Sequence, residues 1–353
     1  MNSESRSSSG VALIMVLWII TILSVVALEF SFAMRTEVNI TKNFKEEFEL
    51  YAIAQGGVHR AIAELILKHD PRVQQLKKTM KTEEGTPEMT EWVSDGRPNV
   101  LQFERGECEL RIMSEAGKIN INTISETTLR KVIGNLGLEA EKRDVVVDSI
   151  LDWRDPDDLL RINGAENDYY QSLKEPYRCK NANLDSIEEL LLIKGVTPEL
   201  FYGKKGTSAG EEGVTKAGGE GVKAADVGLK DIFSVYAPGE QVDVNSASLP
   251  VLRAALGLSI GVSKAILKAR EEKEFQNQQD LLQRVPELNP FIAGIAVRLV
   301  FSTTSAVLSV YYTIESRGKS KEGGAVRGLK AIVKIDRMDK KGYKIVQWVD
   351  ALS

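Results

Sequence analysis

The sequence predicts an α+β protein in which a long N-terminal transmembrane helix packs on a small antiparallel sheet that a large all-α insertion interrupts. An uncharged apolar run covers residues 11–28, and a helical apolar pattern continues beyond it. Alternating apolar and polar residues, typical of strands, occur at 100–117 and again at 305–350. The residues between them, 118–300, have the pattern of short capped helices. A separate C-terminal β domain remains the alternative to one interrupted sheet.

The first element is the apolar run from Val11 to Leu28, which only Thr21 and Ser24 interrupt. As a helix it is about 27 Å long, close to the hydrocarbon thickness of a bilayer. A cleaved secretory signal would have a shorter apolar region followed by a small-x-small site. Here the small residue, Gly10, precedes the run. We therefore expect a transmembrane segment over residues 11–30, preceded by a separate segment at residues 1–10.

The helical pattern does not stop at the membrane. Apolar residues recur on one face at steps of three, four and seven: Phe44, Phe48, Tyr51, Val58, Ile62 and Leu65. The chain has no proline before Pro71, so we expect one helix over residues 11–68. Gly56 and Gly57 are its weak point, because each costs up to about 1 kcal/mol relative to alanine. Half of this helix should lie in lipid and half on the soluble domain.

Composition excludes several functions. The chain has 46 basic and 50 acidic residues, so no global field favours nucleic acid. The sequence contains no P-loop, nucleophile elbow or H-E-x-x-H motif. Its two histidines, His59 and His69, lie near the end of the long helix, where we expect exposed side chains rather than catalysts. The sequence therefore predicts a protein that is not an enzyme.

The two cysteines, Cys108 and Cys179, have neither a metal-binding nor a redox spacing. If the soluble part lies in an oxidising compartment, the pair can form one disulfide, which is the expectation here. Cys108 belongs to an alternating strand pattern, so a buried free thiol is the alternative.

The insertion contains an internal repeat. "KININTISETTLRKVIGNLGL" begins at Lys118, and "QVDVNSASLPVLRAALGLSIG" begins at Gln241. Each has an opening that can cap a helix, then a leucine-rich helix and a glycine-containing turn. The second continues in a way that resembles helix-hairpin-helix, or SAM-like, modules, and part of a third copy begins at Asn181. We expect two such subdomains in residues 118–300, with a flexible glycine-rich loop at 203–228.

Helix-hairpin-helix modules often bind DNA through backbone amides and nearby basic side chains. An alternative function is therefore a membrane-anchored periplasmic DNA receptor. Phosphate binding normally recruits several lysines or arginines. Lys264, Lys268 and Arg270 are present, but three glutamates follow them at once: Glu271, Glu272 and Glu274. We therefore expect no nucleic acid partner.

The stretches "GVALIMVLWII" and "DWRDPDD…GAENDYY…LDSIEELLLIKGVTPEL" resemble the type II secretion system protein K family, also called general secretion pathway protein K. Members are minor pseudopilins. The resemblance implies a pilin-like helix and a pseudopilin β-sheet domain built from residues 69–117 and 301–353. It implies that prepilin peptidase removes the leader after Gly10 and that Val11 becomes an N-methylated first residue. The expected location is the bacterial inner membrane, with one span and a periplasmic soluble domain.

In most pilin-like subunits the fifth mature residue is a glutamate that pairs with a neighbour's N-terminal amine. Counted from Val11, the fifth residue here is Met15. The chain thus lacks the glutamate that would hold it above another subunit, and this absence suits a position at the tip of the filament. The resemblance implies minor pseudopilins I and J, major pseudopilin G and the inner-membrane secretion platform as partners. The implied role is to initiate the pseudopilus that exports folded proteins across the outer membrane.

Residues 152–168 hold six carboxylates, opposed only by Arg154 and Arg161. Oxygen-rich clusters of this kind suit Ca²⁺, although the spacing is not that of an EF-hand. A solvated acidic loop is the alternative. The resemblance implies calcium in the helical domain, and the ligands expected here are Asp155, Asp157, Asp158, Glu166 and Asp168.

Overall fold

The computed structural model describes residues 7–73, 75, 92–203, 227–301, 309–321 and 325–352. Most of the expected loop at 203–228 lies outside these residues. The α-helices are α1 (Ser7–His69), α3 (Glu126–Gly134), α4 (Ala140–Arg154), α5 (Asn167–Gln171), α6 (Pro198–Tyr202), α7 (Leu229–Ile232), α8 (Leu249–Ala254), α9 (Ile260–Glu272) and α10 (Gln278–Arg284). The strands are β1 (Asp95–Gln102), β2 (Gly106–Ser114), β3 (Ile119–Asn120), β4 (Phe233–Ser234), β5 (Gln241–Asp243), β6 (Arg298–Val300), β7 (Ser309–Ser320), β8 (Val326–Asp336) and β9 (Tyr343–Leu352).

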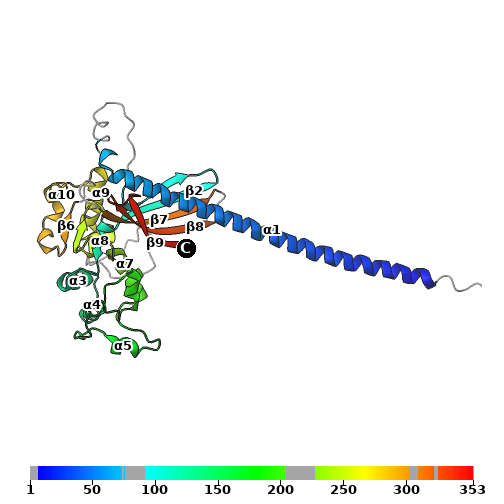
Figure 1. Ribbon diagram of the computed structural model, residues 1–353, viewed down its shortest axis with the longest axis horizontal. Coiled ribbons are helices and arrows are strands. Elements are labelled where there is room, and N and C mark those ends of the chain that lie inside the picture. Colours follow the sequence, from blue (N-terminus) through cyan, green and yellow to red (C-terminus); the bar gives the residue numbers. More distant parts are fainter. Residues whose placement is uncertain are drawn as a thin grey trace, which may run out of the picture.

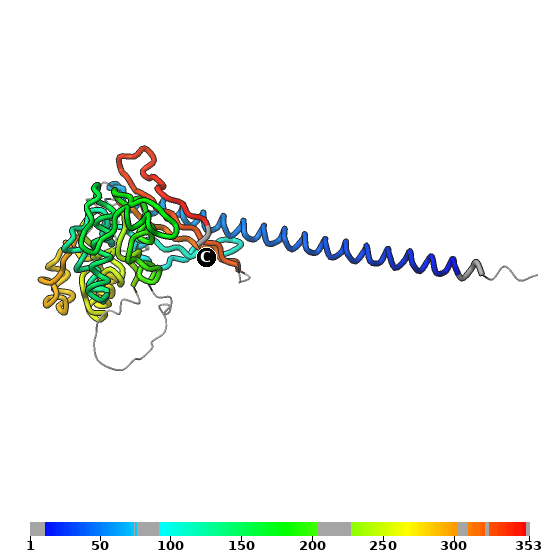
Figure 2. The backbone as a smooth tube through the Cα atoms, turned by 90° about the horizontal axis from the view of Figure 1, so that it is seen from below, coloured from blue at the N-terminus to red at the C-terminus, as the bar shows by residue number. Residues whose placement is uncertain are grey.

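Helix α1 is a single element of 63 residues, and its N-terminal half projects alone from the rest of the molecule (Figures 1 and 2). The apolar side chains from Val11 to Phe32 are exposed. Among the described residues, α1 is the one helix long and apolar enough to cross a membrane. From Leu50 onward one face of the helix is buried, because the apolar stripe then meets the sheet: Leu50, Ile53, Ala54, Val58, Ala61, Ile62 and Leu65.

The sheet has five strands in the order β1-β2-β7-β8-β9, and every neighbouring pair is antiparallel. Strand β2 pairs with β7 along its whole length, with Cys108 opposite Gly318. The insertion therefore leaves the sheet after β2, and the chain returns to it at β7 (Figure 1). This confirms the expected α+β fold class, and the alternative of a separate C-terminal β domain is wrong.

The helix and the sheet approach most closely at Gly57. A Cβ atom at this position would lie 2.3 Å from Cys108 Sγ and 2.6 Å from Ser316 Oγ. Ser316 in turn donates a hydrogen bond of 2.7 Å to the carbonyl oxygen of Ala54. At Gly56 the same added atom would meet only the Phe103 ring, at 3.6 Å. The glycine pair therefore contains one residue that the packing requires and one that it does not.

We expect the two glycines to respond oppositely to alanine. Gly57→Ala should lower the free energy of unfolding by about 1–3 kcal/mol, because the methyl group overpacks a closed core. Gly56→Ala should raise it by up to about 1 kcal/mol, because alanine is the better helix former. Urea unfolding of a soluble fragment that starts at residue 31 measures both, and a similar loss in the two variants would contradict the packing argument.

The insertion has its own core, formed from α3, α4, the later helices and two short parallel strand pairs, β3 with β4 and β5 with β6. Its two repeats fold alike. The Asn122 side chain bonds the backbone nitrogen and oxygen of Leu184 at 2.8 and 2.9 Å. Asn245 makes the same pair of bonds to Phe275, at 2.8 and 2.9 Å. The equivalent asparagines of the two repeats therefore each hold a distant backbone segment in place through two hydrogen bonds.

A buried ion pair joins the insertion to the sheet. The Arg270 guanidinium on α9 lies 3.3 Å from the Asp95 carboxylate at the start of β1, and both side chains are at most 5% exposed. Arg270 also donates to the carbonyl oxygens of Val244 and Ala247. These bonds compensate most of the buried charge and leave only Nε of Arg270 without a partner among the described residues, so the contact fixes where the insertion sits on the sheet.

Candidate functional site

The expected cleavage position lies in the first turns of α1, at the end farthest from the sheet (Figure 1). The helix already begins at Ser7, so Gly10 and Val11 are helical rather than at a helix boundary. The Met15 side chain is 61% exposed. From Val11 to Phe32 the helix therefore exposes its apolar side chains to the surroundings.

The acidic segment follows α4, and Asp152 is its anchor. This carboxylate is fully buried, accepts a hydrogen bond from the Ala165 backbone nitrogen at 2.9 Å and pairs with the Arg161 guanidinium at 2.6 Å. A Cβ atom at Gly164 would lie 1.8 Å from Asp152 Oδ2, so only glycine fits there. Asp152 and Arg161 thus fold the loop back onto the end of α4.

Glu166, at the start of α5, is the unusual member of the segment. Its side chain is 6% exposed, and both carboxylate oxygens are buried without a hydrogen-bond partner among the described residues. Burial, together with the charges of Asp152, Asp155 and Asp158, raises the pKa of Glu166 to about 7, and a weak interaction with the Cys179 thiol opposes this rise only in part. A carboxylate in this position needs either a proton or a cation to be stable.

Two further side-chain oxygens, on residues that interact with Asp158 or Glu166, share its condition. Asp155 Oδ1 and Asn181 Oδ1 are also buried without a partner in the described part of the chain. Asn181 has a backbone φ of 47°, and its Nδ2 donates to Asp157 O at 2.8 Å and to Asp158 Oδ1 at 2.9 Å. The unpartnered oxygens of Asp155, Glu166 and Asn181 form what we term the acceptor cluster. Carboxylate and amide oxygens are the ligands that Ca²⁺ prefers.

The structure therefore brings together only part of the predicted ligand set. Asp155, Asp158 and Glu166 interact. Asp157 is exposed and accepts a hydrogen bond from the Leu159 backbone nitrogen at 2.9 Å, and Asp168 is exposed on α5. Within the described residues, no three acidic, histidine or cysteine side chains are arranged as a ready metal shell. Asn181 is outside the acidic run, so counting carboxylates could not have found it.

The expected disulfide is wrong. Cys108 lies in the core between α1 and the sheet, where its thiol is 3.0 Å from Ser316 Oγ. Cys179 lies in the separate core of the insertion, where burial raises the pKa of its thiol to about 11. Both cysteines are free and buried. The prediction failed because spacing along the chain does not show that the two residues belong to different cores.

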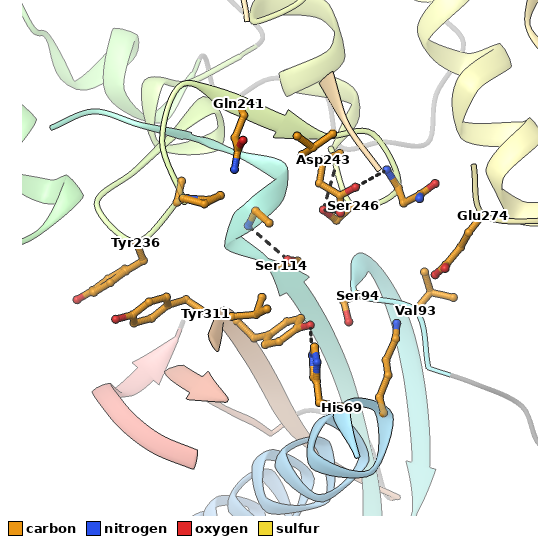
Figure 3. A pocket seen from close by; sticks show the side chains of 18 residues that line it. His69, Val93, Ser94, Ser114, Tyr236, Gln241, Asp243, Ser246, Glu274 and Tyr311 are labelled. Carbon is orange, nitrogen blue, oxygen red and sulfur yellow. Dashed lines mark hydrogen bonds between the residues drawn. The ribbon is translucent and has the colours of Figure 1, made fainter. Parts of the chain in front are cut away.

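A cavity of about 310 Å³ lies where the end of α1, the sheet and the insertion meet (Figure 3). The side chains around it bond to one another: His69 Nε2 to the Tyr312 hydroxyl at 2.7 Å, and Ser246 Oγ to Asp243 at 2.7 Å. His69 is only 5% exposed, so its expected place on the helix surface is wrong. Its fixed contact with β7 makes it part of the junction between helix and sheet.

The helix-hairpin-helix surface is partly used inside the protein. Arg270, one of the three basic residues considered for phosphate binding, is buried in its ion pair with Asp95. The turn between α8 and α9 packs against the other repeat, because Asn135 Nδ2 donates to Ala254 O at 2.8 Å and lies 3.1 Å from the Cβ position of Gly257. Lys264 and Lys268 are exposed on α9. The hairpin therefore contributes to packing between the repeats.

Comparison with known proteins gives two family matches. Residues 108–203 match the model described as type II secretion system protein K, and residues 238–293 match the helix-hairpin-helix motif. Type II secretion system protein K of Pseudomonas aeruginosa is 24% identical over 294 residues, which is 80% of this chain and 78% of that protein. The protein K of Pectobacterium carotovorum is 35% identical over 72 residues, 20% of this chain and 22% of that protein.

A solved structure shares the fold. It is the GspK-GspI-GspJ complex of the enterotoxigenic Escherichia coli type 2 secretion system, in which one chain matches with a TM-score of 0.52 at 15% identity. The match covers 85% of this chain and 97% of that one. The family model and the relatives make the chain similar to type II secretion system protein K, in agreement with the motifs around Asp152 and in the apolar N-terminus, and the solved structure shows that the fold is shared.

Proposed function

We propose that the chain is a minor pseudopilin at the tip of the type II secretion pseudopilus, where it initiates assembly of the filament that exports folded proteins. The observation that carries the proposal is the architecture of α1. Its first half is a bare apolar span, and its second half is packed on a five-stranded sheet. In this proposal one helix serves both as membrane anchor and as the support of the sheet domain, and the role of the chain is mechanical rather than enzymatic.

The proposal places α1 in the bacterial inner membrane, with residues 1–10 in the cytoplasm and the sheet and insertion in the periplasm. Prepilin peptidase would cut between Gly10 and Val11, and Val11 would be methylated. Minor pseudopilins I and J would be its neighbours, as in the complex of the Escherichia coli relative. Major pseudopilin G and the inner-membrane platform would meet the assembled tip.

Met15 supports the tip position. An acidic side chain at this point of the apolar span would need a partner, because an unpaired charge in hydrocarbon is costly. Methionine needs none. The subunit can therefore lie in the membrane without pairing to a subunit above it. At the tip of the filament, no further subunit would have to stack on the bulky insertion.

We further propose that the acceptor cluster holds Ca²⁺. Asp155, Glu166 and Asn181 would supply side-chain oxygens, with Asp158 beside them. The ion would supply the positive charge that Glu166 otherwise obtains from a proton. It would tie the loop after α4 to α5 and to the segment that carries Asn181.

Partner binding tests the function. A soluble fragment starting at residue 31 should bind the soluble domains of pseudopilins I and J and should not bind duplex DNA. Pull-down and calorimetry measure the first, and fluorescence anisotropy measures the second. Submicromolar DNA binding with a steep salt dependence, without binding to I and J, would instead support the DNA-receptor alternative.

A further inference from the structure

The loop between α4 and α5 exposes large apolar side chains. Leu159 is 76% exposed, Leu160 65% and Ile162 98%, all within four residues. Single exposed apolar residues are ordinary on protein surfaces, but a contiguous group marks a contact surface. We call these three residues the apolar finger.

The loop holds the finger outward by turning its polar groups inward. The Arg161 guanidinium, between the apolar residues, points back to Asp152 and Asp155. The Asn163 backbone and side-chain nitrogens both donate to Asp148 Oδ2, at 3.2 and 3.0 Å. A solvated loop has the opposite arrangement, with charges outside and apolar groups covered. The finger is therefore presented in a fixed conformation, which lowers the entropy cost of binding.

The charge around the finger restricts what it can contact. Asp157, Asp158 and Asp168 are exposed nearby. Three of the neighbouring basic side chains are engaged, because Arg161 pairs with Asp152, Lys180 with Glu189 at 2.8 Å, and Lys194 donates to Gly164 O at 2.8 Å. Lys174 and Arg178 are exposed, but with Glu175 the exposed carboxylates still outnumber them. An acidic surface repels an anionic lipid layer and a second copy of itself. It complements a protein with an apolar recess bordered by lysines or arginines.

The position and size of the apolar finger further restrict the kind of partner that it can bind. Helices α4 and α5 lie on the side of the molecule far from α1 (Figure 1). Subunits that assemble through α1 would leave this side uncovered. Stable protein interfaces bury roughly 1,200–2,000 Å², which three side chains cannot provide. The contact suits a protein that is held briefly and then released.

We propose that the apolar finger is a transient docking point for the exported folded protein, which it grips at an apolar recess with a basic rim. This rests on the proposed function, since it requires the chain to meet cargo at the filament tip. The finger adds a recognition surface to a subunit that otherwise acts mechanically.

The test uses the full-length chain in its host bacterium, in place of the native copy. The variant is Leu159→Ser/Leu160→Ser/Ile162→Ser, whose changes lie on exposed side chains and should leave folding intact. Met338→Ser is the matched control, because Met338 is 83% exposed at the turn between β8 and β9. Export is the ratio of one secreted protein in the medium to that retained in the periplasm. Co-purification of pseudopilins I and J is measured in the same cells.

The triple variant should lower the export ratio about tenfold or more, as expected for the loss of an apolar anchor, and retain I and J. The Met338→Ser control should change neither. Unchanged export with I and J retained overturns the inference and leaves the proposed function standing. Loss of I and J also overturns it, because the finger would then belong to the assembly interface. If the unaltered chain does not retain I and J, the proposed function fails and the inference fails with it.

Discussion

Gly10→Val should leave residues 1–10 attached to the chain and abolish export. A peptidase that cuts after residue 10 must fit that side chain, and glycine is the smallest one, at the junction between a polar leader and an apolar helix. Valine adds a branched side chain at this point of α1, where the backbone is already helical. The expected effect is loss of processing rather than a partial decrease.

Intact-mass measurement of the membrane-extracted protein checks this expectation. The unaltered chain should start at Val11 and carry one added methyl group, whereas the Gly10→Val chain should start at residue 1. Ser9→Val is the matched control, because it adds the same side chain one position away and should still be cleaved. A mature unaltered protein that retains residues 1–10 in cells with active peptidase would contradict the proposed site.

Removal of Ca²⁺ should lower the melting temperature of the soluble domain, and Ca²⁺ should restore it. An ion that binds only the native state stabilises it by RT ln(1 + [L]/Kd), about 2.7 kcal/mol at a hundredfold excess over Kd. Mg²⁺ should restore less, because it requires a tighter octahedron and loses water reluctantly. Differential scanning calorimetry with chelator and with each ion measures the effect. Equal melting in chelator and in Ca²⁺, together with no heat of binding, would leave only a buried acidic cluster.

The calcium effect should also depend on pH in a defined direction. Burial raises the pKa of Glu166 to about 7 in the metal-free protein, from an ordinary value of 4.5. The native state therefore binds this proton more tightly than the unfolded chain does. Without metal, stability should fall as pH rises from about 4.5 to about 7. Because Ca²⁺ competes with that proton, its stabilising effect should grow over the same range.

Two variants separate the acceptor cluster from the acidic run as a whole. Glu166→Gln should remove most of the calcium response and flatten the pH dependence. Asp168→Asn, an equal change on an exposed carboxylate of α5, should alter neither. A similar loss in both variants would favour the ligand set expected from sequence over the cluster seen in the structure.

The sequence by itself determined the features that depend on local pattern. The apolar run at residues 11–28 indicates a span by its length, and the stripe from Phe44 to Leu65 extends it into one helix. Alternation at 100–117 and 305–350 predicts strands, and the repeat beginning at Lys118 and Gln241 predicts related helical units. Each of these patterns depends on residues that are close together in the chain, so it can be recognised without knowledge of the fold. The family motifs are local in the same way.

Only the tertiary structure decided which distant residues meet. It separates Cys108 and Cys179 into two cores, buries His69 against Tyr312, and makes Gly57 a packing requirement. It also leaves Asp157 and Asp168 exposed, and it brings Asn181 to Asp158, whose charge acts on Glu166. Burial, and the lack of an N–H or O–H donor to Glu166 among the described residues, distinguish this carboxylate from the others in the segment. Both follow from packing between segments that lie apart in the chain. No count of acidic residues contains that information, because the cost of a buried charge is set by its surroundings.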